Sequence, residues 1–587
     1  MCGIFGYVGK QDNAGEIVLE GIKLLEYRGY DSWGVAVKKG KAIAMEKYVG
    51  KIGDAKIKLP KSNIGIGHTR WATHGGVTVL NAHPHMDCKR QIAVIHNGIV
   101  ENYEELRKIL IQKGHKFVSE TDTEVIAHLA EEYLKKEGFA SAVRDTFNNL
   151  KGLNAVIILN SSSREIVAAK TGSPLVVGIN SHGFFVASDT SGILKHTNKA
   201  IFLEDNQMVI LGDKLKLINL PEGKEIKPNF QTVTWKFEQA EKGQFKHFFL
   251  KEISEQPKIV NNIALYYKEE TKKLANLIDN AFGTFMVACG SASYSALAGT
   301  YLFSRIAKKH INFSIGSEFE YIEDYITPKT LVIPISQSGE SVDVIEPVVN
   351  AKKKKATIVA VVNVLGSTLY RVSDHKILLG AGVEKSVVAT KSLTAMLAVL
   401  MLTAYTLAKK QKEGEILLEK AAENIKIVLQ KKYIDKIKLL AEELKQKEHI
   451  YVIGRGLSYA VALEVTLKLK EATYIHAEGF AGGELKHGVI ALIEKGTPCI
   501  VIAPNDETYN DIISNATEIK ARGGFIIGIG PRNNDIFDRF LETRDVKDAT
   551  MIPQVVIAQL LAYYLALKRG IEDPDKPRNL AKSVTVK

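Results

Sequence analysis

The chain has 587 residues, of which 45% are hydrophobic and 25% are charged, and its formal net charge is +12. This length exceeds what one hydrophobic core supports, so we expect about three domains in a soluble globular protein. The positive charge would suit an anionic partner, but lysines are interleaved with acidic residues in segments such as KEGEILLEKAAENIK (412–426), and no arginine-rich arm is present. We therefore expect a solvated basic surface and no nucleic-acid partner.

The opening sequence MCGIFGYVGK places a cysteine directly after the initiator methionine. If that methionine is removed, Cys2 carries both a thiol and a free α-amine, which titrates near ~8 and can act as its base. Taken alone, Cys2 is better explained as a tolerated residue. The four cysteines, Cys2, Cys88, Cys289 and Cys499, show no C-x-x-C pair and no metal-ligand spacing. They favour a reducing compartment, and no signal peptide is visible, so we expect a cytoplasmic protein without a bound metal.

Residues 1 to about 235 alternate short apolar strands with a few helical segments. The predicted strands are IGIGHTR (64–70), IAVIHNG (92–98), AVIILN (155–160), EIVAAK (165–170), PLVVGI (174–179), GFFVAS (183–188) and QMVILG (207–212). Helical periodicity appears at 15–27, 102–113 and 122–136. This predicts an α+β domain built on antiparallel sheets, followed by a charged connector at 236–250.

Beyond residue 250, apolar strands are followed by longer helices, which predicts doubly wound parallel sheets. The pattern occurs twice: TFMVACG (284–290) corresponds to HIYVIGRG (449–456), with Gly290 matching Gly456, and Glu340 aligns with Glu507. The offsets of 456 − 290 = 166 and 507 − 340 = 167 residues are nearly equal. We therefore predict two copies of one α/β domain, at 251–420 and 421–570, and a tail at 571–587. Chance similarity would explain either match alone.

Two long apolar segments, at 392–408 and 549–567, contain Ser, Thr, Tyr, Pro or Gln. These residues are poorly suited to lipid, so we predict buried helices and no membrane partner.

Five ordered motifs in the N-terminal part, MCGIFG, EYRGYDS (26–32), HTRWATHG (68–75), HNGI (96–99) and ETDTE (120–124), resemble the class II glutamine amidotransferase domain. The resemblance implies an N-terminal nucleophile αββα sandwich in which Cys2 attacks the glutamine amide and Asn97 and Gly98 stabilise the oxyanion. It also implies that Arg70 holds the substrate carboxylate and Asp122 its ammonium. Three further glutamine-site residues follow from the same motif: Trp71, Thr73 and His74.

Each of these assignments has a simpler alternative. Asn97 and Gly98 could form an ordinary turn, and Thr121 and Glu124 could form a capping box at a helix that Asp122 begins. Arginine does present a fork that fits a carboxylate, and paired donors suit an oxyanion. Because Asn97, Gly98 and Asp122 occur in the same domain as Cys2 and Arg70, we favour the glutaminase site over these alternatives.

In the C-terminal part, SQSGES (336–341) follows a strand and precedes a helix, an arrangement typical of anion binding by hydroxyl and N–H groups. A serine-rich turn that only caps the helix is the alternative. The nucleotide-binding pattern G-x-x-x-x-G-K-[ST] is absent, which favours a sugar phosphate. Glu464, Lys468 and Glu471 fall on one helix face, where Glu471 could move a proton; a surface salt-bridge ladder is the usual explanation of such spacing. His487 lies in a glycine-containing loop and is a weak signal alone. In the tail, Lys582 lies in an uncharged stretch and could form a Schiff base if it docks in an apolar niche; an ordinary exposed lysine is the alternative.

Five more motifs, CGSASYSA (289–296), SQSGES, KLKEATYIHAE (468–478), GELKHG (483–488) and PRNLAKSVTV (577–586), resemble the tandem sugar isomerase domains of the glutamine:fructose-6-phosphate aminotransferase family. The resemblance implies conversion of fructose 6-phosphate and glutamine to glucosamine 6-phosphate and glutamate, the first step of amino-sugar synthesis, by a homodimer without a metal or organic cofactor. It further implies that Lys582 binds the C2 ketone, that Glu471 moves a proton between C1 and C2, and that His487 of a neighbouring subunit assists ring opening. Trp71 would gate an ammonia channel. The implied sugar-phosphate contacts are Ser291, Ser336, Gln337, Ser338, Ser341, Val387, Glu464 and Lys468.

The chain departs from the family pattern at Ala292 and Ala389, where a serine is usual, and at Val489, where a proline is usual. Sugar contacts at the two alanines would be lost or made by neighbours such as Ser293. Two relatives that share the N-terminal domain, phosphoribosyl-pyrophosphate amidotransferase and asparagine synthetase, do not fit, since their nucleotide or phosphoribosyl loops are absent. A sugar-phosphate-binding regulator without turnover would normally carry a helix-turn-helix, which the sequence lacks.

Overall fold

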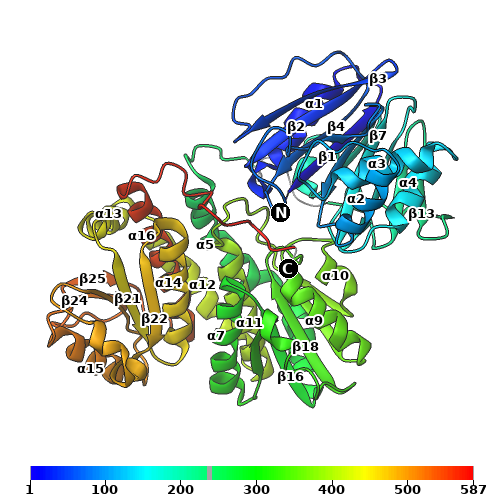
Figure 1. The fold of residues 1–587 in the computed structure, drawn as a ribbon. Helices are drawn as coiled ribbons and strands as arrows, with labels where there is room; N and C mark the ends of the chain where they lie inside the picture. Colours follow the sequence, from blue (N-terminus) through cyan, green and yellow to red (C-terminus); the bar gives the residue numbers. More distant parts are fainter. Residues whose placement is uncertain (1, 234–240, 586–587) are drawn as a thin grey trace. The chain divides into compact units, whose positions relative to one another are not determined.

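The computed structural model describes residues 2–233 and 241–585, which divide into two compact units. The first comprises residues 1–241 with 581–587, and the second residues 242–580. Figure 1 shows the elements of each. Part of the predicted connector, 236–240, lies outside the described residues, and helix α5 (Phe248–Tyr266) begins within its last residues.

The first unit contains two antiparallel sheets. One has the order β15 (Gln231–Thr232), β11 (Lys199–Phe202), β9 (Val176–Asn180), β10 (Gly183–Ala187), β1 (Gly3–Gly9), β4 (Ile64–Arg70), β2 (Ser32–Lys39), β3 (Ala42–Val49). The other has the order β14 (Lys224–Ile226), β13 (Leu215–Asn219), β12 (Gln207–Leu211), β8 (Ile166–Thr171), β7 (Asn154–Asn160), β6 (Ile92–Asn97), β5 (His85–Met86). The predicted strands are present within one or two residues, but the hairpin of β2 and β3 was missed.

Alternating side chains explain why these strands form layers. Ile4 and Ile66 from the first sheet and Ile95 and Ile157 from the second lie in one buried cluster, which fills the space between the sheets. Helix α1 (Ala14–Leu24) packs on the outer face of the first sheet. The outer face of the second sheet is covered by three helices, α2 (Tyr103–Gln112), α3 (Glu124–Leu134) and α4 (Phe139–Asn148). The unit is therefore an αββα sandwich, as predicted.

The second unit contains two five-stranded parallel sheets of identical topology. The first has the order β17 (Asn312–Ile315), β16 (Gly283–Ala288), β18 (Thr330–Ser336), β19 (Thr357–Val362), β20 (His375–Leu378). The second has the order β22 (His476–Ala481), β21 (His449–Gly454), β23 (Pro498–Ile502), β24 (Phe525–Gly530), β25 (Arg539–Glu542). In each sheet the first strand of the repeat lies between the second and the third: β16 between β17 and β18, and β21 between β22 and β23. This shared 2-1-3-4-5 order confirms the predicted duplication of a doubly wound fold.

Helices cover both faces of each parallel sheet, which is why the strands read as continuous apolar runs. Between the sheets lies one large core that includes residues of α7 (Ser291–Leu302), α11 (Lys391–Leu407), α12 (Gln411–Val428), α14 (Leu457–Thr473) and α16 (Met551–Lys568), together with α5, α6 (Lys268–Asn280) and α13 (Lys431–Leu444) (Figure 1). Smaller clusters pack α8 (Gly316–Phe319), α9 (Val342–Lys353) and α10 (Thr368–Val372) on the first sheet and α15 (Tyr509–Lys520) on the second.

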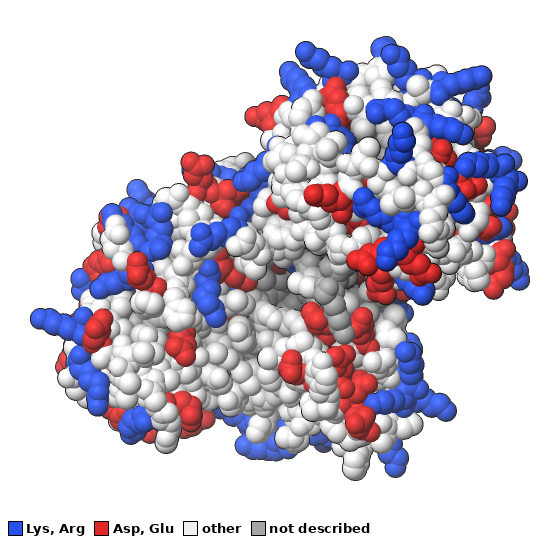
Figure 2. Space-filling model, viewed as in Figure 1, with Lys and Arg blue, Asp and Glu red and all other residues white. Residues whose placement is uncertain are grey.

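The two apolar segments singled out in the sequence are the buried helices α11 and α16, as predicted. The helical stretch Lys547–Lys568 is long and apolar enough to cross a membrane, but 89% of its apolar window is buried inside the protein. On the face shown in Figure 2, lysine and arginine are interspersed with aspartate and glutamate, in agreement with a solvated basic surface.

Candidate active site

Cys2 immediately precedes β1 and lies next to the end of β4, and the residue that follows it must be glycine. The Gly3 N–H donates to Thr69 Oγ1 at 3.1 Å, and a Cβ added at Gly3 would lie 2.5 Å from that same oxygen. The glycine of the opening motif therefore permits the close approach of β1 and β4 that brings Cys2 to Trp71.

The groups around Cys2 fix both its thiol and its carbonyl. The Trp71 N–H donates to the Cys2 Sγ at 3.2 Å. Arg28 Nε and Asn97 Nδ2 donate to the Cys2 carbonyl oxygen at 3.1 and 2.9 Å. Burial raises the pKa of the Cys2 thiol, opposed by the Trp71 N–H and by the positive charges of Arg70 and Arg28. The thiol therefore needs a nearby base to become a nucleophile at neutral pH.

His68 sets the orientation of Asn97. Burial lowers the pKa of His68 to about 3, so the ring is neutral. Its Nε2 lies 3.0 Å from the His96 carbonyl and 3.2 Å from Asn97 Oδ1, so it carries the proton and donates to both. With its oxygen held in this way, the Asn97 amide must present Nδ2 to Cys2. Sequence reasoning missed Arg28 and His68, although both lie inside motifs that it recognised.

Gly98 follows Asn97 at the end of β6 with φ +128°, and a Cβ there would lie 2.2 Å from the Leu153 carbonyl oxygen. Only glycine fits this conformation and space. The chain continues from here into α2 rather than into a neighbouring strand, so the pair is not a hairpin turn.

Arg70 is bonded to a loop formed by residues 74–76. Its Nη1 donates to the Gly76 carbonyl at 3.1 Å and its Nη2 to the carbonyls of Gly75, at 3.0 Å, and His74. Burial lowers the pKa of Arg70. The Arg70 guanidinium, which we expect to hold the substrate carboxylate, is thus oriented by the backbone carbonyl groups of loop 74–76.

Asn81 and Glu120 clamp the same loop. Asn81 Nδ2 donates to the Gly76 carbonyl at 3.0 Å and to Glu120 Oε2 at 2.8 Å, and Glu120 Oε2 also accepts the Gly76 N–H at 3.2 Å. The clamp joins HTRWATHG to ETDTE, which are 45 residues apart at their closest in sequence (120 − 75 = 45). Sequence reasoning gave Asn81 no role, since an asparagine outside the motifs carries no signal of its own.

Asp122 accepts the Val100 N–H at 2.8 Å and is buried. The capping-box alternative is wrong: α3 has Thr123 at its N-cap, and the Glu124 carboxylate accepts the N–H groups of Val118 and Ser119. Of the other glutamine-site candidates, Trp71 packs edge-on against Tyr30, His74 against Tyr103, and Thr73 is exposed.

In the second unit, SQSGES forms the turn between β18 and α9. Ser336 Oγ accepts the Gly339 N–H at 3.0 Å, and Ser338 Oγ accepts the Glu340 N–H at 3.1 Å. Gly339 has φ +66°, and a Cβ there would lie 2.1 Å from Ser367 Oγ. Ser341 is the N-cap of α9 without a side-chain capping bond, so the capping explanation fails for it.

The equivalent turn of the second repeat has different chemistry. Glu340 is buried and its carboxylate accepts both the N–H and the hydroxyl of Thr368 at 2.8 Å. Its counterpart Glu507 is exposed and pairs with Arg305 at 2.7 Å. Since Asp506 precedes it, an anion would be repelled from the second turn. Only the first repeat offers a phosphate-compatible turn.

The three charged residues of α14 are not a surface ladder. Glu464 is 2% exposed and Lys468 is fully buried. Lys468 Nζ lies 2.5 Å from Glu471 Oε2 and 3.5 Å from Glu464 Oε1, and Ser291 Oγ, from the start of α7, donates to Glu464 Oε1 at 3.2 Å. Burial raises the pKa of Glu464 to about 7. Burial acts to lower the pKa of Lys468, but the two carboxylates outweigh it and raise that pKa.

The remaining candidates lie on three other segments. The Val387 N–H donates to the Asp575 carbonyl at 2.8 Å, which ties the loop before α11 to the segment after α16. His487 is exposed at the end of a short 3-10 helix, Gly482–His487. Lys582 is half-buried. The structure thus brings together Cys2, Asn97 and Trp71 in one unit and Ser291, Glu464, Lys468 and Glu471 in the other.

Comparison with known proteins agrees with this division. Residues 70–195 match the model of the glutamine amidotransferase domain, and residues 277–405 and 443–569 match that of the SIS domain. The chain is 44% identical to the glutamine–fructose-6-phosphate aminotransferase [isomerizing] of Thermococcus kodakarensis and 41% identical to that of Clostridium tetani, with all of each chain covered. The chain belongs to the glutamine–fructose-6-phosphate aminotransferase family.

A solved structure, the C-terminal domain of the glucosamine-fructose-6-phosphate aminotransferase of Francisella tularensis, covers 56% of this chain and 98% of its own. It has a TM-score of 0.52 and 32% identity to this chain. A phosphosugar isomerase fold from Silicibacter pomeroyi, with a TM-score of 0.50 and 24% identity, supports the tandem fold alone.

Asn81→Ala removes three hydrogen bonds: the two that Asn81 Nδ2 donates to the Gly76 carbonyl and Glu120 Oε2, and the one that Asn81 Oδ1 accepts from the Glu120 N–H at 2.9 Å. Because Glu120 and Gly76 are exposed and can bond to water instead, only the net contribution of these bonds is lost, roughly 1–3 kcal/mol of stability in the first unit. We also expect a raised KM for glutamine with a smaller change in kcat. Chemical denaturation and initial-rate kinetics measure these two quantities. Asn148→Ala, which removes one bond from an exposed residue to the Pro221 carbonyl, is the control and should change neither. Equal effects of the two substitutions would contradict the clamp.

Glu464→Gln tests the buried carboxyl group. The folded-state pKa near 7 lies above the ordinary value of 4.5, so protonated Glu464 contributes stability that is full below pH 4.5 and is lost as the pH rises through 7. Glutamine cannot ionise, so the variant should gain stability relative to wild type between pH 5 and pH 8, on the order of 3 kcal/mol. Urea unfolding at both pH values measures the difference, with the exposed Glu423→Gln as control. Parallel pH profiles for wild type and Glu464→Gln would rule out the raised pKa.

Proposed function

We propose that the protein converts D-fructose 6-phosphate and L-glutamine to D-glucosamine 6-phosphate and L-glutamate. One observation carries this proposal: a single chain holds a fixed Cys2 thiol beside Trp71 and Asn97 and a buried Glu464–Lys468–Glu471 group on α14. Curated relatives aligned over the whole chain bear the name of this reaction. The domain limits that we propose are 2–235, 251–420 and 421–570, with a connector at 236–250 and a catalytic tail at 571–587.

In the glutaminase step, removal of Met1 leaves Cys2 with a free α-amine, which takes the thiol proton. The Cys2 Sγ then attacks the side-chain amide carbon of glutamine, the C–N bond breaks, ammonia leaves with a proton, and water hydrolyses the thioester to glutamate. Asn97 Nδ2 and the Gly98 N–H stabilise the oxyanion, each worth roughly 10²–10³ in rate. Support comes from His68, which holds Asn97 with its amide nitrogen on the Cys2 side.

Glutamine itself is bound through its two charged α-substituents. Arg70 pairs with the carboxylate and Asp122 with the ammonium, while Thr73 and His74 line the site. The bonds between Arg70 and the carbonyls of loop 74–76 support the idea that this loop positions the guanidinium. Trp71 gates the path by which ammonia leaves.

In the synthase step, Ser336, Gln337, Ser338 and Ser341 bind the phosphate, and Ser291, Val387, Glu464 and Lys468 hold the sugar. His487 of a second subunit opens the ring. The Lys582 amine forms a Schiff base with the C2 ketone, with loss of water. Ammonia then displaces the lysine from C2, since the product carries its nitrogen there. Glu471 transfers a proton from C1 to C2 and the C1 hydroxyl proton passes to the nitrogen on C2, which leaves an aldehyde at C1 and an amine at C2.

These steps are proton transfers and imine exchanges among the chain's own residues, so the proposal includes no metal or organic cofactor in catalysis. We further propose that the enzyme is a homodimer in the cytoplasm, since the synthase site draws His487 from a second subunit.

Purified protein given glutamine and fructose 6-phosphate should form glucosamine 6-phosphate and glutamate in equal amounts, and Cys2→Ala should abolish both products because the nucleophile is lost. Chromatography with mass detection measures them. The variant should still bind fructose 6-phosphate in calorimetry, since its sugar site is intact. Cys499→Ala, at a buried core cysteine of β23, is the matched control and should keep activity. Glutaminase activity in Cys2→Ala would refute the nucleophile assignment.

Borohydride reduction in the presence of fructose 6-phosphate should attach the sugar covalently to Lys582, because the hydride reduces the imine at C2 to a stable amine. Peptide mass mapping locates the adduct. Lys582→Arg should lose the label, and Lys576→Arg, in the same tail region, should keep it. A sugar adduct found on another lysine would overturn the role given to Lys582.

A further inference from the structure

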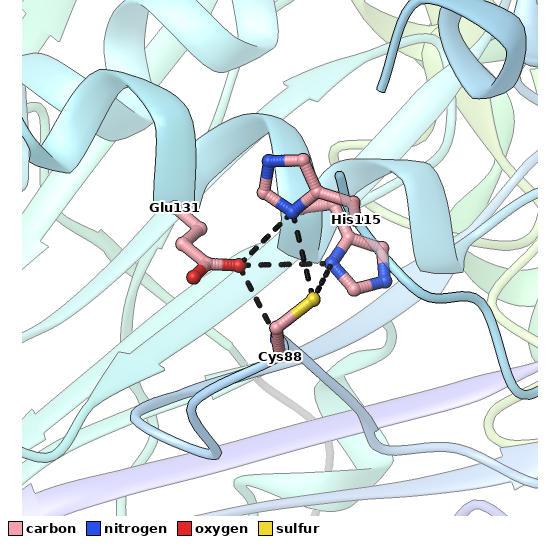
Figure 3. Close-up of side chains that lie close together, drawn as sticks. Cys88, His115 and Glu131 are labelled. Atoms are coloured by element: carbon pink, nitrogen blue, oxygen red, sulfur yellow. Dashed lines mark hydrogen bonds and ion pairs between the residues drawn. The ribbon is translucent and has the colours of Figure 1, made fainter. Parts of the chain in front are cut away.

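Four side chains that take no part in the proposed reaction converge in the first unit. Cys88 lies in the turn between β5 and β6, His115 follows α2, and His128 and Glu131 lie on α3. One ligand atom from each lies within 4.8 Å of all the others. Figure 3 shows Cys88, His115 and Glu131 pointing toward one another from different elements.

The distances within this cluster fit a tetrahedral ion. Cys88 Sγ lies 3.6 Å from His115 Nδ1 and 3.6 Å from His128 Nδ1. Glu131 Oε2 lies 3.1 Å from His115 Nδ1 and 3.8 Å from His128 Nδ1. Tetrahedral zinc, with bonds of about 2.3 Å to sulfur and about 2.0 Å to nitrogen or oxygen, separates sulfur from nitrogen by about 3.6 Å and nitrogen from oxygen by about 3.3 Å.

The far nitrogen of each imidazole faces a carboxylate. His115 Nε2 lies 2.7 Å from Glu132 Oε1, and His128 Nε2 lies 3.4 Å from Glu124 Oε1. A carboxylate accepts a hydrogen bond from Nε2–H, and in this tautomer the lone pair of each Nδ1 is directed into the cluster. Each Nδ1 then faces Cys88 Sγ and Glu131 Oε2 as a possible ligand atom, which is the arrangement that a shared cation requires.

Backbone N–H groups further suit an anionic sulfur and carboxylate. The Lys116 N–H donates to Cys88 Sγ at 3.4 Å, and the Cys88 N–H donates to Glu131 Oε2 at 3.2 Å. Three of the four residues are buried, whereas Cys88 is exposed and gives an ion a path from solvent.

We propose that Cys88, His115, His128 and Glu131 bind a structural zinc ion. One sulfur, two imidazole nitrogens and one carboxylate oxygen favour zinc over calcium or magnesium, which prefer oxygen ligands in larger number. Four protein ligands close the coordination shell, so the ion stabilises the fold instead of activating water.

The proposed ion would also stabilise the segment that leads to Asp122, a predicted residue of the glutaminase site. It joins the segment at 115–118 to α3, and the Glu124 carboxylate holds the N–H groups of Val118 and Ser119 in the same segment. Asp122 lies two residues before α3 begins. Zinc would therefore fix the chain that leads into ETDTE from both sides.

This proposal departs from the expectation of a chain without a metal. The ligands are separated by 115 − 88 = 27, 128 − 115 = 13 and 131 − 128 = 3 residues. Only His128 and Glu131 are close enough to suggest a site by their helical spacing, so the sequence pattern alone did not reveal it.

Metal analysis of the purified full-length protein tests the proposal. After dialysis into metal-free buffer, wild type should contain close to one zinc per chain by plasma mass spectrometry. Cys88→Ser and His115→Gln should each lose most of it, while Cys499→Ala, outside the cluster, keeps it. Circular dichroism verifies that the variants are folded. Glu132→Gln should weaken zinc affinity 10- to 100-fold, because it removes the charge of the carboxylate behind His115 and leaves all four ligands in place.

Cobalt replacement gives a reading that does not depend on variant folding. Wild type stripped of zinc and loaded with cobalt should show thiolate-to-cobalt charge-transfer absorption and strong d–d bands, the signature of a tetrahedral site with one sulfur ligand. Stripping should also lower the thermal midpoint of the first unit, and zinc should restore it. Wild type that neither retains nor takes up zinc, or equal zinc in wild type, Cys88→Ser and His115→Gln, would overturn the proposal.

Discussion

The glutaminase half depends on how the backbone of Cys2 is held. Its carbonyl accepts hydrogen bonds from Arg28 and Asn97, and its thiol accepts the Trp71 N–H. These donors come from three separate motifs, and the glycine at position 3 lets β1 pack closely enough to reach them. A residue this close to the chain terminus would otherwise fray. Here strand pairing and three donors fix it, so reaction geometry follows from the fold of the sandwich.

The synthase half shows how a duplicated fold acquires one site. Both repeats place a glycine of positive φ, Gly290 and Gly456, between the first strand and its helix. Only the second repeat carries the buried charges of α14, and only the first carries the serine turn. Burying Lys468 is unfavourable unless carboxylates surround it, which explains why Glu464 and Glu471 accompany it on one helix face. Burial raises the pKa of Glu464, the charge of Lys468 opposes the rise, and the charge of Glu471 adds to it.

Much of this architecture could be predicted from local pattern. Short apolar segments marked strands such as β4 and β7, and nearly equal offsets between matching motifs indicated the duplicated sheets. The hairpin of β2 and β3 was missed because its lysines, such as Lys38 and Lys47, interrupt the apolar pattern. In the site, motif residues were predicted, but the groups that orient them were not. Asn81 reaches Gly76 and Glu120 only after folding, and the zinc ligands meet across 43 residues (131 − 88 = 43). Such contacts leave no short-range signal.

In the proposed reaction the nucleophile is the thiol of an N-terminal cysteine, and the α-amine of that same residue serves as its base. Intact-mass analysis of the active enzyme, combined with labelling by a glutamine analogue that alkylates the catalytic thiol, is the decisive experiment. We expect a chain that begins at Cys2 and carries one label on that residue. A fully active enzyme that retains Met1, or a label on another cysteine, would contradict it.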